Sequence, residues 1–145
     1  MDFINRIIHA LTVLHPTHPM FVHFPIALTG SAFLFILIAW WKNSASLEQT
    51  AFANMVLASL STIVAGITGY LDNIKNYEGE APNASVKITL AITLFLLTAG
   101  ISFARYRNPN IFTTNKRVMY IASYGVSFAI ALVLAFLGGI ILYGF

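Results

Sequence analysis

The chain has 145 residues, of which 58% are hydrophobic and only 9% charged, and its mean hydropathy is +0.78. A soluble domain has about a quarter charged residues, so this composition excludes a soluble globular enzyme and a disordered chain. The eight basic residues are scattered and form no basic face, which excludes a nucleic-acid binder despite the pI of about 9.4. Because the sequence has no cysteine, disulfides, zinc–thiolate sites, iron–sulfur clusters and covalently attached haem are excluded as well.

The N-terminal segment has an amphipathic pattern. Apolar residues recur at helical spacing at Phe3, Ile7, Leu11 and Leu14, and polar residues separate them. We predict a helix over residues 2–14 that lies in the membrane interface. A frayed extension of the following span is the alternative.

Four uncharged stretches follow, and charged residues mark their ends. A helix needs roughly 20 apolar residues to cross a bilayer, and the third, shortest stretch is completed by two cations that can snorkel to the interfaces. Without water to satisfy the backbone, continuous apolar runs without alternation favour helices over barrel strands. The predicted spans are Pro19–Trp41, Glu48–Leu71, Ser85–Arg105 and Arg117–Tyr143.

The connections between these spans are short and polar. Residues 42–47 form a turn, residues 73–83 contain Gly79 and Pro82, and residues 106–116 contain the turn signal Asn108-Pro109-Asn110. Short connections make sequential helices antiparallel neighbours. The predicted fold is therefore all-α: one transmembrane domain over residues 1–145, a four-helix up-down bundle preceded by an interfacial helix.

The basic residues are unevenly divided between the two ends of this bundle. One end has Lys42, Arg105, Arg107, Lys116 and Arg117, whereas the other has three basic residues together with most of the acidic ones. We expect an inner-membrane protein. Cytoplasmic loops of such proteins are enriched in Lys and Arg, so the first end should face the cytoplasm. Both termini and all four histidines then lie on the outer, periplasmic side.

The histidines are the candidate site residues, because an ionisable group inside a span is costly and is a functional candidate by default. His23 is such a group, about 7 Å deeper than His18 at helical rise. The two differ by about 140° around the helix, which argues against a zinc site of the kind with two histidines four apart. Two alternatives stay open: a metal held by His15, His18 and Asp72, or a b-type haem held by His23 alone or with a second ligand. Against both stands the simpler interpretation that these histidines lie at the interface and bond to backbone carbonyls or water.

Other polar or small residues near the outer face complete the candidate set. Asp72 ends the second span and would pair with His18, Lys75 or Lys87, orienting an imidazole as carboxylates beside metal sites do. Lys87 begins the third span, where snorkelling is its simplest role. Gly138 and Gly139 either form a packing notch in the last span or admit a flat cofactor or quinone ring.

One run of residues resembles a known family signature. Residues 18–28 read HPMFVHFPIAL, which is similar to the HPxxVHFPIAL motif of the domain-of-unknown-function 2231 family of bacterial membrane proteins. The endings Gly69-Tyr70-Leu71-Asp72 and Leu137–Tyr143 look like that family's G-x-x-D and GG-x-L-V-Y segments, and Arg105 matches an arginine that closes its third span. The resemblance extends from about residue 14 to the end.

The resemblance implies a role beside electron-transfer proteins. Domains of this family are often joined to, or encoded beside, c-type cytochromes and other respiratory components, so haem or quinone is the implied cofactor or partner. By position it points to His18, His23, Asp72, Gly138 and Gly139. Many members have a histidine near the start of the third span, where residues 86–89 here read VKIT. That departure removes the second axial ligand that such a histidine would give.

Three functions are therefore compared. The favoured one is an accessory or structural subunit, with no catalysis of its own, that packs against other membrane subunits such as a c-type cytochrome. The alternative is a redox subunit that binds b-type haem or a quinone near the outer face through His18 and His23. A transporter or metal-handling protein, for which His18 and His23 are the candidate metal ligands, is the weakest, because no span interior has a carboxylate and no pair of broken helices appears in two halves.

Overall fold

The computed structural model describes residues 3–9 and 17–143, and all the long elements in them are helices. A short helix, α1 (Phe3–His9), precedes four long ones: α2 (Thr17–Lys42), α3 (Ala45–Tyr77), α4 (Ala84–Arg107) and α5 (Arg117–Tyr143). A 3₁₀ turn, η2 (Ile111–Thr113), lies between α4 and α5. The predicted all-α, four-helix architecture with a preceding short helix is confirmed.

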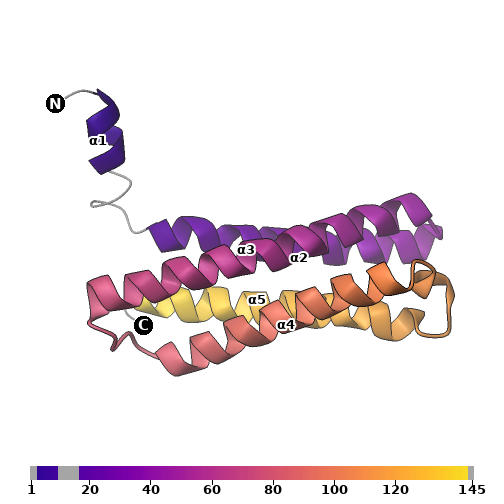
Figure 1. The fold of residues 1–145 in the computed structure, drawn as a ribbon. Coiled ribbons are helices and arrows are strands. Elements are labelled where there is room, and N and C mark those ends of the chain that lie inside the picture. Colours follow the sequence, from indigo (N-terminus) through magenta and orange to yellow (C-terminus); the bar gives the residue numbers. More distant parts are fainter. Residues whose placement is uncertain (1–2, 10–16, 144–145) are drawn as a thin grey trace.

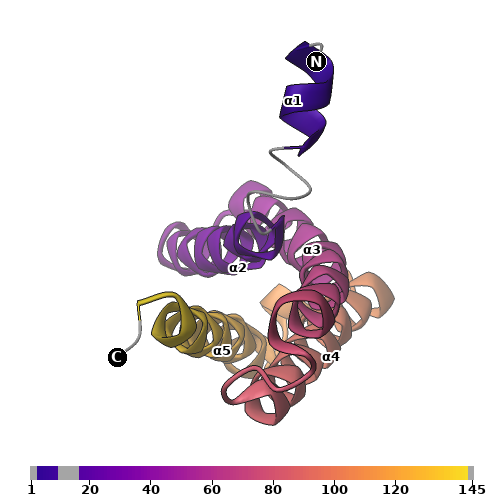
Figure 2. The same ribbon diagram turned by 90° about the vertical axis from the view of Figure 1, so that its left-hand side faces the viewer.

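The long helices run up and down and form a ring of four (Figures 1 and 2). Each packs against the helices before and after it in the chain, and α5 closes the ring against α2. This order follows from the short connections, because a short connection makes each helix run antiparallel beside the one before it. As a result, the α2–α3 turn and the α4–α5 connection lie at one end, and the α3–α4 loop lies at the other.

The outside of the bundle is apolar, as lipid requires. In the described residues, four helices are long and apolar enough to cross a membrane: His18–Lys42, Ala45–Tyr77, Ala84–Arg107 and Arg117–Ile140. Large side chains such as Leu34, Leu60 and Phe136 are more than half exposed on the bundle surface. Contact with hydrocarbon accounts for this exposure, and the protein is a membrane protein with four helical spans.

Small and hydroxyl-bearing residues line the interior, which lets the helix backbones approach. Thr29, Thr62, Thr98 and Ser127 are buried, and each hydroxyl donates to the carbonyl oxygen four residues earlier in its own helix. Such bonds satisfy the hydroxyl without a partner helix. Glycines allow close contact between α2 and α5: Gly30 lies against the ring of Phe128, and Gly125 lies against the ring of Phe33.

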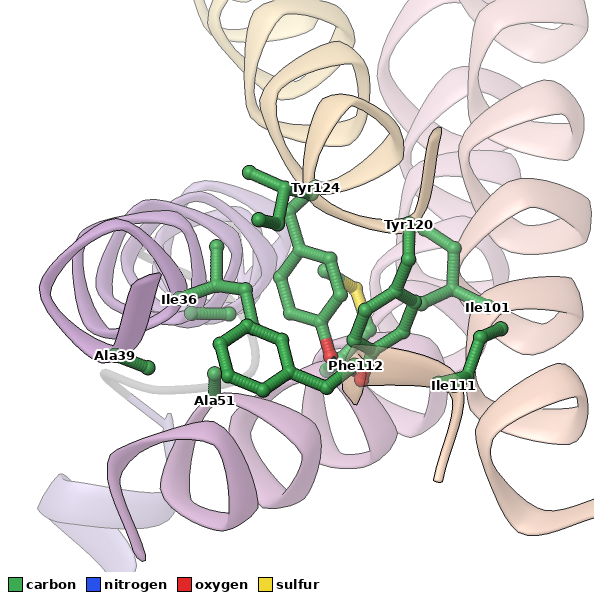
Figure 3. Close-up of a cluster of buried hydrophobic side chains, with 11 residues drawn as sticks. Ile36, Ala39, Ala51, Ile101, Ile111, Phe112, Tyr120 and Tyr124 are labelled. Carbon is green, nitrogen blue, oxygen red and sulfur yellow. Dashed lines mark hydrogen bonds between the residues drawn. The ribbon is translucent and has the colours of Figure 1, made fainter. Parts of the chain in front are cut away.

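A cluster of buried side chains lies towards the end with the α2–α3 turn. Figure 3 shows it: Ile36 and Ala39 from α2, Ala51 from α3, Ile101 from α4, Ile111 and Phe112 from the connection, and Tyr120 and Tyr124 from α5. Arg117 strengthens this end. Its Nη2 donates to the Trp40 carbonyl (3.3 Å) and to Asn43 Oδ1 (3.4 Å), and its guanidinium lies 4.4 Å from the centre of the Phe112 ring.

The ends of the helices differ somewhat from the predicted spans. The last helix has the predicted bounds, but α3 begins at Ala45 and continues to Tyr77 instead of ending at Leu71. The charged residues that end the predicted span therefore do not mark the ends of this helix. Glu78 and Gly79, at positive φ, then end the helix, and the Asn73 side chain accepts from the Ala81 amide to hold the loop (3.0 Å).

The N-terminal helix is described over Phe3–His9, within the predicted range of residues 2–14. In α1, the side chains of Phe3, Ile4, Ile7 and Ile8 are all exposed, and the helix stands apart from the bundle (Figure 1). The predicted continuation to residue 14, with Leu11 and Leu14, lies outside the described residues. The interfacial position of this segment stays a prediction, favoured by the exposed apolar side chains.

Candidate functional site

His18 lies at the start of α2 and faces α3. Its ring packs against Gly69, where an added Cβ would lie only 2.7 Å from the imidazole Cε1, and its Nδ1 is 3.3 Å from the hydroxyl of Thr68. The side chain is therefore half-buried between two helices. Gly69 has a specific use here, because the absence of a side chain gives the imidazole its space.

His23 lies on the opposite side of the same helix. Its side chain is exposed, and its Nδ1 donates to the carbonyl oxygen of Pro19. Among the described residues, the other ring nitrogen, Nε2, has no hydrogen-bond partner. Because the side chain is exposed, this imidazole is accessible from outside the bundle.

The two histidines are thus not brought together. Their five-residue spacing places His18 at a helix contact and His23 on the lipid-facing side, as the predicted angle of about 140° requires. No group of three His, Asp or Glu residues that could hold a metal ion occurs in the described parts of the chain. The pair does not fit a haem or metal held by both histidines within one bundle.

Asp72 lies near His18, one turn further along α3 than Gly69. It interacts electrostatically with His18 and with Lys87 of α4, and its Oδ1 accepts from the Asn76 amide (2.5 Å). Asp72 is therefore close enough to His18 and Lys87 to interact electrostatically, as predicted. It forms no direct hydrogen bond with either side chain among the described residues. His15 lies outside the described residues, so its candidate role stays a prediction.

The two glycines of α5 are open rather than packed. Gly138 and Gly139 are half-buried, and no heavy atom of the described residues lies within 4 Å of a Cβ built on either. Packing inside this part of the bundle does not require glycine at either position. Their role as a notch for a ring or a helix from outside stays a proposal.

A second polar cluster lies at the other end, inside the bundle. Glu48 of α3 is 3% exposed, and Arg105 of α4 clamps it with two parallel bonds, Nε to Oε1 (2.6 Å) and Nη2 to Oε2 (2.9 Å). Tyr120 of α5 donates to Glu48 Oε1 (2.9 Å) and lies 2.8 Å from the hydroxyl of Tyr124. This network joins three helices through one carboxylate.

The sequence interpretation missed this cluster because it used Glu48 and Arg105 only as markers of span ends. A signal existed: Tyr120 and Tyr124 are four apart, on one face of a helix, and Tyr hydroxyls buried at a membrane interface need partners. Bidentate pairing with arginine is the arrangement in which a buried carboxylate is best satisfied. Glu48 is therefore the point at which α3, α4 and α5 are fixed relative to one another.

A pocket of about 320 Å³ lies beside this network. Its wall includes the first turns of α3, the end of α4 and the α4–α5 connection, with Glu48, Gln49, Arg105 and Asn110 among the polar residues. The second pocket, near Ser85 and Leu90 at the start of α4, is shallow and apolar. Of these two pockets, the first has charged residues in its wall.

Comparison with known proteins gives one result. No curated protein and no solved structure matches the chain. A family model described as "Predicted membrane protein (DUF2231)" matches residues 14–145, which include all four spans and both polar clusters. The chain therefore belongs to this family of membrane proteins, the DUF2231 family.

Proposed function

We propose that the protein is a small accessory subunit of a larger membrane complex of the respiratory or electron-transfer type, with a structural role and no catalysis of its own. The observation that carries the proposal is the exposed imidazole of His23, whose Nε2 has no partner in the described parts of the chain. An ionisable side chain facing lipid is costly and calls for a partner.

The surroundings of His23 suit a helix from another subunit. Met20, Ala27 and Leu34 are exposed and share its side of α2, because they recur at helical spacing. A partner helix could bury this apolar strip and offer a polar group to Nε2. Interhelical hydrogen bonds of this kind contribute to association in membranes by about 0.6–2 kcal/mol each.

The arrangement in the membrane follows from the charges. Lys42, Arg105, Arg107, Lys116 and Arg117 are at the end that has the α2–α3 turn. In an inner membrane, the positive-inside rule assigns that end to the cytoplasm. Both termini and the histidines then face the periplasm, where a c-type cytochrome or a quinone is the proposed partner.

A redox role is the second candidate, favoured by the same free nitrogen. His23 Nε2 could serve as one ligand of a b-type haem. Pro25 and Thr29 occupy the core side of α2 and are buried in the bundle. His23 faces outward, so such a haem would lie between this chain and a partner. Haem supplies one-electron chemistry when bound. His18 would have to leave Gly69 to take part, and the open space at Gly138 and Gly139 would take a flat ring.

The test is the size of the native assembly. A tagged chromosomal copy, extracted in mild detergent, should migrate on a blue-native gel in an assembly far larger than the 15.9 kDa chain, together with respiratory subunits. His23→Phe should release it, whereas His9→Phe, in α1, should not. Migration of the wild-type chain alone or as copies of itself would overturn the proposal.

A reduced-minus-oxidised spectrum of the same assembly separates the two candidates. An accessory subunit contributes no haem. His23→Phe should therefore lower the amount of assembled complex, while the b-type haem content of each complex that still forms stays unchanged. Specific loss of a b-type signal from an otherwise intact complex would instead establish the redox role.

A further inference from the structure

The pocket beside Glu48 is placed where lipid headgroups lie. Its walls come from the beginning of α3, the end of α4 and the residues that connect α4 to α5. Each of these segments lies at the end of a membrane-spanning helix. With a volume of about 320 Å³, it falls at the lower end of the roughly 300–1,000 Å³ typical of ligand pockets.

Arg105 has donor capacity left over for a ligand in this pocket. Its Nε and Nη2 donate to Glu48, while Nη1 has no hydrogen-bond partner among the described residues. Arg105 is one of the residues that line the pocket. Guanidinium groups match phosphate oxygens in geometry as well as charge.

The negative charge of Glu48 is offset within the cluster. Two bonds from Arg105 and one from the Tyr120 hydroxyl occupy both carboxylate oxygens. The side chains of Ser46, Gln49 and Asn110, which can donate to a phosphate, also belong to the wall. An anion in the pocket therefore meets donors rather than an unpaired carboxylate.

The whole end of the bundle is positively charged. It has Lys42, Arg105, Arg107, Lys116 and Arg117 against one acidic residue, Glu48, in the described parts of the chain. Basic pockets between spans at such an end are suited to anionic lipid headgroups. A zwitterionic lipid gains less from this excess, because the positive group of its own headgroup offsets its phosphate.

We propose that this pocket binds the phosphate of an anionic phospholipid, with Arg105 Nη1 as the main donor and the acyl chains lying along the apolar surface of α3 and α4. Phe112 and Pro109 in the wall provide the apolar contact below the headgroup. The bound lipid would bridge α3, α4 and the α4–α5 connection, the same elements that Glu48 holds together.

Native mass spectrometry of the purified full chain in detergent tests the proposal. Titration with dioleoylphosphatidylglycerol should show binding about fivefold tighter than with dioleoylphosphatidylcholine, the gain expected from one basic group near the surface. Two substitutions fill the pocket at exposed positions, Ser46→Phe and Thr113→Phe. Each should remove the preference while the helical circular dichroism stays unchanged.

Lys42→Ala is the matched control, because Lys42 is exposed at the same end of the bundle and is absent from the pocket wall. It should keep the preference. Equal binding of the two lipids, an unchanged preference in both pocket variants, or an equal loss in Lys42→Ala would overturn the proposal. Inorganic phosphate at millimolar concentration should not compete with the lipid; if it does so fully, the site is one for free phosphate.

Discussion

At the scale of single residues, the molecule has two polar sites with opposite character. Glu48 is buried and both its carboxylate oxygens are hydrogen-bonded, whereas His23 is exposed and its Nε2 has no partner among the described residues. A satisfied buried group fixes structure, and an unsatisfied exposed group at membrane depth calls for something outside the chain. The first site therefore concerns stability, and the second concerns association.

The Glu48–Arg105 pair gives the largest expected effect on stability. Arg105→Met leaves the Glu48 carboxylate buried without its ion partner, and we expect a loss of about 3 kcal/mol in the free energy of unfolding, measured by denaturant titration in detergent. The double variant Glu48→Leu with Arg105→Met should lose less than the single one, because neither charge remains buried. A double variant that is less stable than Arg105→Met would contradict this account.

The position of His18 depends on Gly69. In Gly69→Ala the new Cβ overlaps the imidazole, so the ring must turn out of the α2–α3 contact at a cost of about 1 kcal/mol. Modification of His18 by diethyl pyrocarbonate, located by peptide mass, should become faster. Gly66→Ala is the control, since no heavy atom lies within 4 Å of its built Cβ; equal rates in both variants would show that His18 is placed elsewhere.

The candidate site was only partly predictable at this scale. Residue types and spacing were enough to single out His18 and His23 and to place them on different sides of one helix. They could not show that Glu48 and Arg105, 57 positions apart, meet inside the bundle. That contact depends on how α3 and α4 rotate against each other, which charge counting does not reveal.

At the scale of helices, glycine sets the distance between α2 and α5. A Cβ at Gly30 would lie 2.9 Å from the Phe128 ring, which is itself enclosed by the helix contact. We expect Gly30→Ala to lower the free energy of unfolding by about 1 kcal/mol. Gly100→Ala in α4, with no heavy atom within 4 Å of the added Cβ, should be neutral or stabilising through helix propensity.

Helix number and order could be predicted, but not all helix ends. Hydrophobic length requires four spans, and short polar connections require their order. The end of α3 at Tyr77 follows from the left-handed conformation of Glu78 and Gly79. Residues 73–83 are polar throughout, so composition alone does not separate the last helical turn from the loop that follows. Polarity indicates where lipid ends, whereas backbone conformation decides where a helix ends.

At the scale of the whole molecule, the two ends should lie on different sides of the membrane. The chain has no native cysteine, so single cysteines report unambiguously. In intact cells, a membrane-impermeant maleimide should label Asn76→Cys, near the end of α3, and should not label Asn43→Cys in the α2–α3 turn before lysis. Labelling of Asn43→Cys from outside would reverse the proposed orientation.

The central claim is that the His23 side of α2 contacts another subunit, and site-specific photocrosslinking tests it most directly. Met20 on that side and Ile92 on α4 are each 54% exposed, so they form a matched pair. With benzoylphenylalanine at each position in native membranes, the account predicts a discrete adduct heavier than the chain from Met20 and none from Ile92. No adduct at Met20, or equal adducts at both positions, would contradict it.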